Sequence, residues 1–170
     1  KSIFVIRYGK KYFKVLKNPN FKVLVLTNFH KNYLMNLGFI ENNIYVLPNS
    51  FSSEIIIKKN NENNDLVYAG RISKEKGVEE LVKAFINSQA SNLNLVLIGD
   101  GPLKQNLENT YSRHTNIKFL GQKSNFETKE IIANSKAVVT ATKLFEGQPT
   151  LLCEASFMGV PSIFPNFGGI

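Results

Sequence analysis

The chain has 170 residues and is 43% hydrophobic, and no apolar run approaches the roughly 20 residues of a membrane-spanning helix. Its single cysteine, Cys153, excludes an intramolecular disulfide and favours a reducing compartment, so the cytoplasm is the expected location. The size suits one globular domain with part of another, and without an initial Met or a signal-peptide pattern we expect a piece of a longer chain.

All of the excess positive charge falls in the first 40 residues. The net charge is +8, and residues 1–40 hold eight basic residues and no acid, whereas the remaining residues carry 13 of each sign. Such a segment attracts an anionic partner, which could be a phosphorylated substrate, an acidic membrane or nucleic acid, although a solvated basic surface explains it equally well. The basic residues are Lys1, Arg7, Lys10, Lys11, Lys14, Lys17, Lys22 and Lys31.

The first part of the chain has the weaker pattern. Two β-rich runs, at 21–27 and 43–48, flank a predicted helix over 32–39 that is ended by Gly38. The polar, Asn-rich stretch 50–64 then predicts a loop or linker. Residues 1–49 are therefore predicted to be the tail of one α/β unit.

The second part, residues 65–170, alternates short apolar runs with helical patterns. Strands and helices that alternate in this way predict parallel βαβ units in a doubly wound, Rossmann-like α/β sheet, here incomplete at its end. The continuous apolar run at 95–98 suits a strand buried on both faces. The predicted strands are 65–70, 93–99, 116–121, 136–142 and 160–165, and the predicted helices are 78–88, 103–113, 128–135 and 150–158.

Loops that are rich in glycine or charge follow the predicted strands. Because the carboxyl ends of parallel strands meet at one edge of a sheet, we expect these loops to converge there. Arg71 and Lys76, unless they are ordinary surface cations, would neutralise a diphosphate there. Gly99 and Gly101 mark a tight turn without the third glycine of the dinucleotide fingerprint, which disfavours nicotinamide binding. The other loop residues at this edge are Gly70, Gly121, Gln122 and the pair Gly168-Gly169.

Two glutamates, Glu146 and Glu154, flank the predicted start of the last helix with seven residues between them. Acids at a phosphate site are best explained as acceptors for sugar hydroxyls, because they would repel the phosphates themselves. Pro149 and Thr150 open the helix, whose first N–H groups and dipole suit a phosphate or sugar oxygen. Glu154 lies among apolar helix residues, where a charge needs a partner.

These motifs, in this order, resemble the C-terminal nucleotide-sugar-binding domain of the family 4 glycosyltransferases, which are retaining enzymes of the GT-B type. The resemblance covers residues 45–170. It rests on the glutamate pair together with the segments Val46–Ser50, Tyr68–Arg71, Glu75–Gly77, Gly99–Pro102, Phe119–Gly121 and Gly168-Gly169. It implies a GT-B C-terminal domain over 65–170, truncated at both ends, preceded by a linker and by the tail of an acceptor-binding domain over 1–49.

The resemblance also implies a role for each site residue. Arg71 and Lys76 would contact the donor diphosphate, and Glu146 the donor sugar, which makes these three the catalytic candidates. Glu154 would bind the ribose, and the loop 121–124, with Gly121 and Gln122, would lie near the base. The remaining donor-binding candidates are Gly70, Gly99, Gly101, Gly147, Gln148, Pro149, Thr150 and Leu151. The Gln148-Pro149 step departs from the commoner family pattern and leaves the transferred sugar open.

The expected substrates follow from the same resemblance. The donor would be a UDP-, GDP- or ADP-sugar, with no cofactor and no metal required. His30 and His114 have no matching Ser, Cys or metal cluster in the sequence, so both are expected to pack or to lie at the surface. The acceptor would be a glycan or a lipid-linked glycan in surface polysaccharide or glycolipid synthesis, with contact to the inner face of the plasma membrane through residues 1–31. This chain alone is expected to bind the donor weakly and to transfer sugar poorly.

Three other functions stay open at this point. A nucleotide-sugar epimerase shares the fold, and a phosphorylase would need a pyridoxal-bearing Lys for which the sequence shows no context. A non-catalytic nucleotide- or nucleic-acid-binding module would use the basic N-terminal segment. The aromatic residues of that segment fit packing better than base stacking, so no nucleic acid is expected.

Overall fold

The computed structural model describes residues 11, 13–50 and 63–166, which fall into two compact units. Unit 1 is formed by the chain up to Ser50 together with Glu146–Gln148, and unit 2 by the rest of the described chain. The predicted linker over 50–64 lies almost wholly outside the described residues, as do Lys1, Arg7, Lys10 and the pair Gly168-Gly169. Within the described ranges, no helix is long and apolar enough to cross a bilayer.

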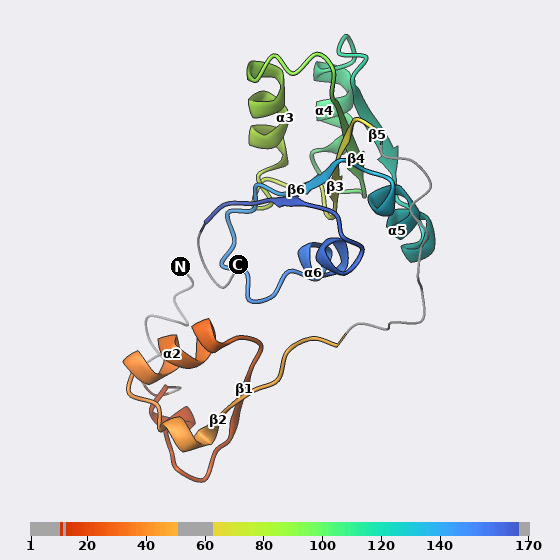
Figure 1. The fold of residues 1–170 in the computed structure, drawn as a ribbon. Coiled ribbons are helices and arrows are strands. Elements are labelled where there is room, and N and C mark those ends of the chain that lie inside the picture. Colours follow the sequence, from red (N-terminus) through yellow and green to blue (C-terminus); the bar gives the residue numbers. More distant parts are fainter. Residues whose placement is uncertain (1–10, 12, 51–62, 167–170) are drawn as a thin grey trace. The chain divides into compact units, whose positions relative to one another are not determined.

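Unit 2 is a five-stranded parallel sheet with helices on both faces (Figure 1). The strand order β5-β4-β3-β6-β7 confirms the predicted doubly wound architecture. The strands are β3 (Asp65–Ala69), β4 (Asn94–Ile98), β5 (Ile117–Gly121), β6 (Ala137–Val139) and β7 (Ser162–Ile163), and the helices are α3 (Val78–Asn87), α4 (Lys104–Thr110), α5 (Asn125–Ala133) and α6 (Thr150–Phe157).

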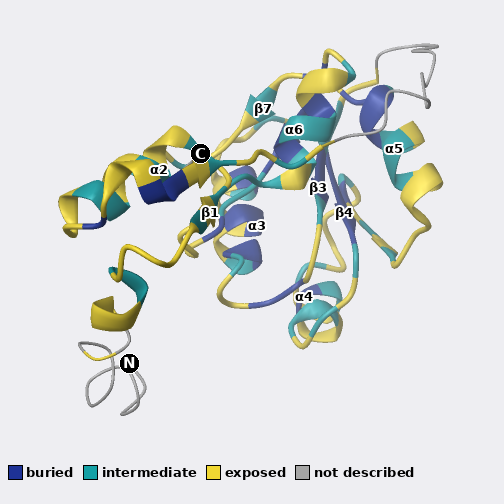
Figure 2. Cartoon of the chain, turned by 90° about the horizontal axis from the view of Figure 1, so that it is seen from below, coloured by how far each residue is buried: buried dark blue, intermediate teal, exposed yellow. Residues whose placement is uncertain are grey.

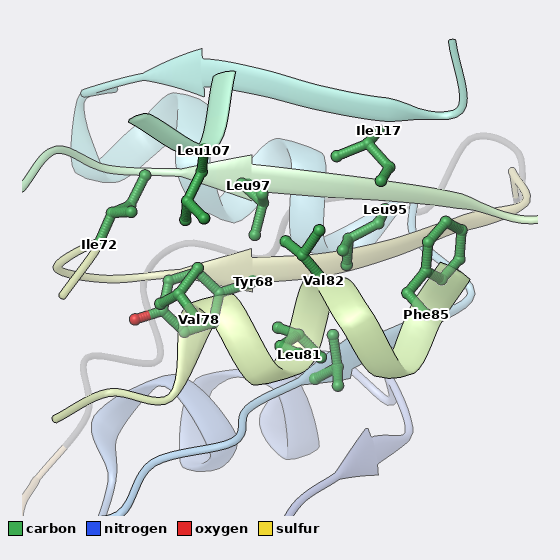
Figure 3. Close-up of a cluster of buried hydrophobic side chains, with 11 residues drawn as sticks. Tyr68, Ile72, Val78, Leu81, Val82, Phe85, Leu95, Leu97, Leu107 and Ile117 are labelled. Carbon is green, nitrogen blue, oxygen red and sulfur yellow. The ribbon is translucent and has the colours of Figure 1, made fainter. Parts of the chain in front are cut away.

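The core of unit 2 consists of two layers because successive strand residues point to opposite faces of the sheet. In β3, Tyr68 belongs to the cluster under α3 and α4, whereas its neighbour Val67 belongs to the cluster under α5 and α6. Buried residues accordingly concentrate in β3, β4 and the inner sides of the helices (Figure 2). In Figure 3, one face of α3 packs Val78, Val82 and Phe85 against the sheet. Burial on both faces explains the continuous apolar run in β4.

The strand order places a topological switch point between β3 and β6. The chain runs outward from β3 to β4 and β5, and then returns to place β6 on the other side of β3. In open α/β sheets, ligands bind in the crevice at the carboxyl ends of the two strands that flank such a reversal. The loops after β3 and β6 are therefore the ones that the fold sets beside a ligand.

Several element ends of unit 2 differ from the prediction. Helix α4 ends at Thr110 rather than at 113, and β6 ends at Val139 rather than at 142. Helix α5 begins at Asn125 rather than at 128, because Ser124 and Glu127 form a capping box that adds a turn at its start. Strand β7 is only Ser162–Ile163 rather than 160–165, since the flanking prolines, Pro161 and Pro165, have no N–H to donate to a sheet ladder.

Unit 1 contains a parallel strand pair, β1 (Val23–Val25) and β2 (Ile44–Val46), connected through helix α2 (Asn28–Asn36) and a 3-10 turn (Glu41–Asn43). The prediction put the helix four residues late, because Thr27 caps it by accepting a hydrogen bond from the His30 N–H at 3.4 Å.

Three of the N-terminal lysines have partners within unit 1. Lys22 donates to the buried Asn43 at 2.7 Å, and Lys31 pairs with Glu41 at 3.0 Å. The ammonium of Lys17 lies 5.7 Å from the centre of the Phe39 ring. Part of the basic charge therefore stabilises the unit itself.

Candidate functional site

The loops at the carboxyl edge of unit 2 are bonded to one another through their backbones. The Gly99 N–H donates to the Gly121 carbonyl at 2.8 Å, and the Ile72 N–H donates to the Asp100 carbonyl at 2.9 Å. Gly99 has a φ of +130°, and a Cβ at this position would overlap the Gly70 carbonyl oxygen. A residue without a side chain is therefore required where these loops cross. The predicted convergence of Gly70, Gly99 and Gly121 is present in the structure.

The loop over residues 70–77 is held by a hydrogen bond from a residue of the hydrophobic core. The buried Tyr68 donates its hydroxyl to the Arg71 carbonyl at 2.8 Å, while Arg71 itself is exposed and Lys76 is half-buried. A hydrogen bond to its own backbone N–H is the main cause that lowers the pKa of Glu75, and the charges of Arg71 and Lys76 lower it further. Arg71 and Lys76 thus both lie within electrostatic range of the Glu75 carboxylate.

The loop after β6 is joined to the 70–77 loop at the switch point. The Lys143 N–H donates to the Glu75 carbonyl at 2.9 Å, and the Lys143 ammonium pairs with Glu80 on α3. Gly77 lies against the Ala141 carbonyl so closely that no side chain fits between them. The paired cations are therefore held beside the segment that leads from β6 toward α6.

Helix α6 begins beside that segment, with Pro149 at its N-cap and Thr150 as its first residue. No side chain caps its N-terminus. The helix carries Glu154, whose carboxylate lies 3.5 Å from the ammonium of Lys129 on α5. The sequence predicted that this acid needs a partner, and Lys129 is that partner.

The segment Glu146–Gln148 belongs to unit 1, although the residues on either side of it belong to unit 2. The Gln148 side-chain carbonyl accepts from the Asn49 N–H at 2.7 Å, and its main-chain carbonyl accepts from the Asn49 side chain at 3.3 Å. Gly147 lies against His30, where a Cβ would be 2.8 Å from the imidazole Cε1. Glu146 is half-buried. The sequence did not predict this grouping of Asn49, His30 and Gly147, which are far apart along the chain.

The loop 121–124, expected near the base, joins β5 to α5. Gln122 and Lys123 are exposed, and Ser124 caps α5. Hydrogen bonds from Ser124, first of all through its hydroxyl, hold the pKa of Glu127 below its ordinary value. The capping box gives this loop a fixed end at the carboxyl edge of the sheet.

A cavity of about 300 Å³ lies at the opposite edge of the sheet. It is lined by the end of α3 and by the segments that precede β4 and β5, including Gln89, Ser91 and His114. It contains none of the predicted site residues and no Arg or Lys, so it offers no charge for a diphosphate. The described residues also contain no cluster of His, Cys, Asp and Glu able to hold a metal ion.

Comparison with known families gives a clear result. The family model described as glycosyl transferases group 1 matches residues 52–170, which is most of the chain and includes all of unit 2 that the structure describes. The chain belongs to the glycosyl transferases group 1. This membership favours a transferase over the epimerase, phosphorylase and nucleic-acid alternatives.

Two curated relatives are named for polysaccharide synthesis. The teichuronic acid biosynthesis glycosyltransferase TuaC of Bacillus subtilis is 35% identical over 104 residues, which is 61% of this chain and 25% of that protein. The amylovoran biosynthesis glycosyltransferase AmsD of Erwinia amylovora is 28% identical over 159 residues, which is 84% of this chain and 42% of that protein. This chain therefore spans less than half of either relative.

Solved structures share the fold. The pneumococcal O-GlcNAc transferase GtfA, in complex with UDP and GlcNAc, has a TM-score of 0.76 at 23% identity, over 95% of this chain and 33% of that one. Anabaena HepE, in complex with UDP and glucose, has a TM-score of 0.71 at 18% identity, over 94% of this chain and 48% of that one. At these identities the likeness establishes the fold of this chain and nothing about its ligand.

Sequence reasoning gave no supporting role to three residues beside the candidate site, namely Tyr68, Lys129 and Lys143, although Tyr68 begins the Tyr68–Arg71 segment of the resemblance. The hydroxyl of Tyr68 was invisible because a Phe would satisfy the same apolar pattern. Lys129 and Lys143 were not singled out, since their partners, Glu154 and Glu80, are far away in the sequence. The sequence indicates that Glu154, in the apolar helix α6, needs a cation as partner. It does not indicate which one, because the proximity of Lys129 depends on the tertiary structure.

Proposed function

We propose that this chain is the donor-binding part of a retaining, family 4 glycosyltransferase of the GT-B type. Residues 65–170 would form its C-terminal nucleotide-sugar-binding domain, and residues 1–49 the tail of its acceptor-binding domain. The observation that carries the proposal is the switch point of unit 2, where the 70–77 loop with Arg71 and Lys76 is bonded to the loop after β6.

The two cations suit the diphosphate of a nucleotide sugar. The planar guanidinium of Arg71 can donate two parallel hydrogen bonds to phosphate oxygens, and Lys76 adds a point charge. The uncapped N-terminus of α6 contributes N–H groups and a positive dipole end. Cleavage of the bond between the anomeric carbon and the diphosphate leaves negative charge on the leaving group, which these groups stabilise without a metal ion.

The acids would bind the hydroxyl-bearing parts of the donor. We assign the ribose to Glu154 and the donor sugar to Glu146, where a carboxylate also suits the positive charge that develops on the sugar ring. The backbone from Gly147 to Leu151 would lie beside the phosphates and the sugar. The turns at Gly70, Gly99 and Gly101 would let the backbone approach the nucleotide, and Gly121 and Gln122 would lie near the base.

The donor and acceptor classes follow by analogy with the relatives. GtfA and HepE were solved with UDP, so UDP-sugars are the first donors to test, with GDP- and ADP-sugars next. The names of TuaC and AmsD support a glycan or lipid-linked acceptor in surface polysaccharide synthesis. Such a protein would act in the cytoplasm at the inner face of the membrane, where its basic N-terminal segment would meet anionic lipid.

A nucleotide-binding panel tests this proposal. UDP, GDP, ADP and uridine are compared by thermal shift, because a ligand that binds only the native state raises the melting temperature. We expect a diphosphate to stabilise the chain and uridine to do so far less. The dissociation constant of the best diphosphate is then measured by calorimetry for wild type and for two variants, Arg71→Met and Arg113→Met.

The two variants remove the same charge from different places. Arg71→Met is expected to weaken binding about tenfold to a hundredfold, which is the usual cost of losing hydrogen bonds between charged groups. Arg113 is exposed and precedes β5, at the opposite edge of the sheet, so Arg113→Met is expected to leave affinity unchanged. Equal effects of the two substitutions, or equal affinities for uridine and the diphosphates, would contradict the proposal.

A further inference from the structure

The ion pair between Lys129 and Glu154 joins two helices on the same face of the sheet. The Lys129 ammonium is 3.5 Å from the Glu154 carboxylate, and the two side chains are 20% and 23% exposed. A surface pair within one helix, Lys83 and Glu79, is 56% and 41% exposed by comparison. The Lys129–Glu154 pair is therefore set into the surface, where water screens it less.

Partial burial makes each charge depend on the other. A carboxylate that is removed from water becomes costly unless a cation or hydrogen-bond donors compensate it. Glutamate also has a flexible side chain, and an ammonium at a fixed place on α5 restricts the positions that its carboxylate can occupy. The pair thus holds the Glu154 carboxylate in one orientation.

A carboxylate in a fixed place is what a ribose site requires. The 2′- and 3′-hydroxyls of a ribose are hydrogen-bond donors, and an ionised carboxylate in a fixed place is a strong acceptor for both. We propose that Lys129 is a positioning residue for ribose recognition, acting through Glu154 and not by contact with the nucleotide. This inference rests on the ribose role of Glu154 in the proposed function.

The competing explanation is that the pair only fastens α5 to α6. A fastening role would change stability, and any accompanying change in affinity would be the same factor for every nucleotide. A positioning role would change the affinity only for nucleotides that carry ribose hydroxyls. The ratio of two affinities therefore distinguishes the roles, whereas stability alone does not.

The test compares UDP with 2′,3′-dideoxy-UDP by calorimetry at one salt concentration. The proteins are the wild-type chain, Lys129→Met, Lys129→Arg and Glu154→Gln. Wild type is expected to prefer UDP about tenfold to a hundredfold, as for two hydrogen bonds to a charged acceptor. Lys129→Met and Glu154→Gln are expected to lose most of this preference while their affinity for the dideoxy compound stays within about twofold of wild type. Lys129→Arg is expected to restore it.

The outcomes distinguish the positioning role of Lys129 from the ribose role of Glu154, on which it rests. If Glu154→Gln loses the ribose preference and Lys129→Met keeps it, the positioning role is wrong and the ribose role of Glu154 stands. A wild type without ribose preference, or a Glu154→Gln variant that keeps it, overturns both. Equal weakening of both nucleotides by Lys129→Met also overturns the positioning role. If Lys129→Met does not fold, Lys129→Gln takes its place under the same criteria.

Discussion

Tyr68 connects the core of unit 2 to the backbone of the 70–77 loop through one hydrogen bond. Its side chain is 2% exposed, and its hydroxyl donates to the Arg71 carbonyl at 2.8 Å. Tyr68→Phe keeps the ring and removes the hydroxyl that donates this bond. We expect the free energy of unfolding, measured in urea, to fall by about 1 kcal/mol. We also expect affinity for a nucleoside diphosphate to fall, because the Arg71 backbone loses its anchor.

Tyr111→Phe is the matched control for that substitution. Tyr111 packs at the edge of the same core cluster but is only partly buried. Its hydroxyl removal is expected to affect stability less and diphosphate affinity not at all. A Tyr68→Phe variant that matches wild type in both measurements would show that the hydroxyl does not anchor the loop.

Gly99 lies where the loops after β3 and β4 cross, and Gly159 serves as a control for it, because an alanine there would meet backbone strain but no neighbouring atom. Both have positive φ values, +130° and +71°, but a Cβ at Gly99 would overlap the Gly70 carbonyl, whereas at Gly159 nothing lies within 4 Å. Gly159→Ala is expected to cost about 1 kcal/mol of stability, the price of a left-handed residue. Gly99→Ala adds the overlap and should cost about 3 kcal/mol or more. Equal losses in chemical denaturation would mean that the loops separate easily.

Among single residues, the sequence predicted best those that act together with close neighbours along the chain. Arg71 and Lys76 lie in one loop, and the charges of both lower the pKa of Glu75 there, because a few residues of chain keep them near each other. Their contact with a diphosphate stays a prediction. Lys129 escaped prediction because its distance from Glu154 depends on how α5 packs beside α6. The role of Glu146 is still a prediction from its spacing to Glu154.

At the scale of elements, the ion pair between Lys143 and Glu80 links the loop after β6 to helix α3. The hydrogen bond from Lys143 is the first cause that lowers the pKa of Glu80 below its ordinary value of 4.5. A carboxyl with a lowered folded-state pKa stabilises the fold above that ordinary value and loses this contribution as the pH falls through the folded-state pKa. Melting temperature should therefore decline as the pH is lowered below about 4.5.

Glu80→Gln tests the contribution of this link. Its melting temperature is expected to decline less steeply with acid than that of wild type, and Lys143→Met should behave in the same way. The difference is expected to be small, because an exposed ion pair contributes at most about 1 kcal/mol. Glu75 and Glu127 also have lowered pKa values, so some acid sensitivity should persist. If both variants follow the wild-type profile, the pair does not stabilise the fold.

The order and type of elements in unit 2 were predictable, whereas several ends were not. Helix α3 matched closely because its apolar residues recur at helical spacing over its whole length. Helices α2 and α5 began earlier than predicted, since Thr27 and Ser124 cap turns that carry little apolar pattern. Capping residues act on polar turns, which an analysis of hydrophobic periodicity passes over.

At the scale of the whole molecule, the positive charge is concentrated in the N-terminal segment, but it is not all available to a partner. Lys22 and Lys31 are engaged with Asn43 and Glu41 inside unit 1, while Lys11 and Lys14 are exposed. Contact with anionic membrane therefore stays a prediction. Co-sedimentation with vesicles rich in phosphatidylserine should fall steeply with added salt if the prediction holds.

The central claim is that the nucleotide binds at the carboxyl edge of the sheet in unit 2. The most direct measurement is backbone amide NMR of the labelled chain during a titration with UDP. We predict saturable shifts concentrated at 70–77, 99–103 and 121–124 and at the start of α6, and their loss in the double variant Arg71→Met/Lys76→Met. Shifts centred on the cavity at the opposite edge, around Gln89–Ser91 and His114–Asn116, would contradict it.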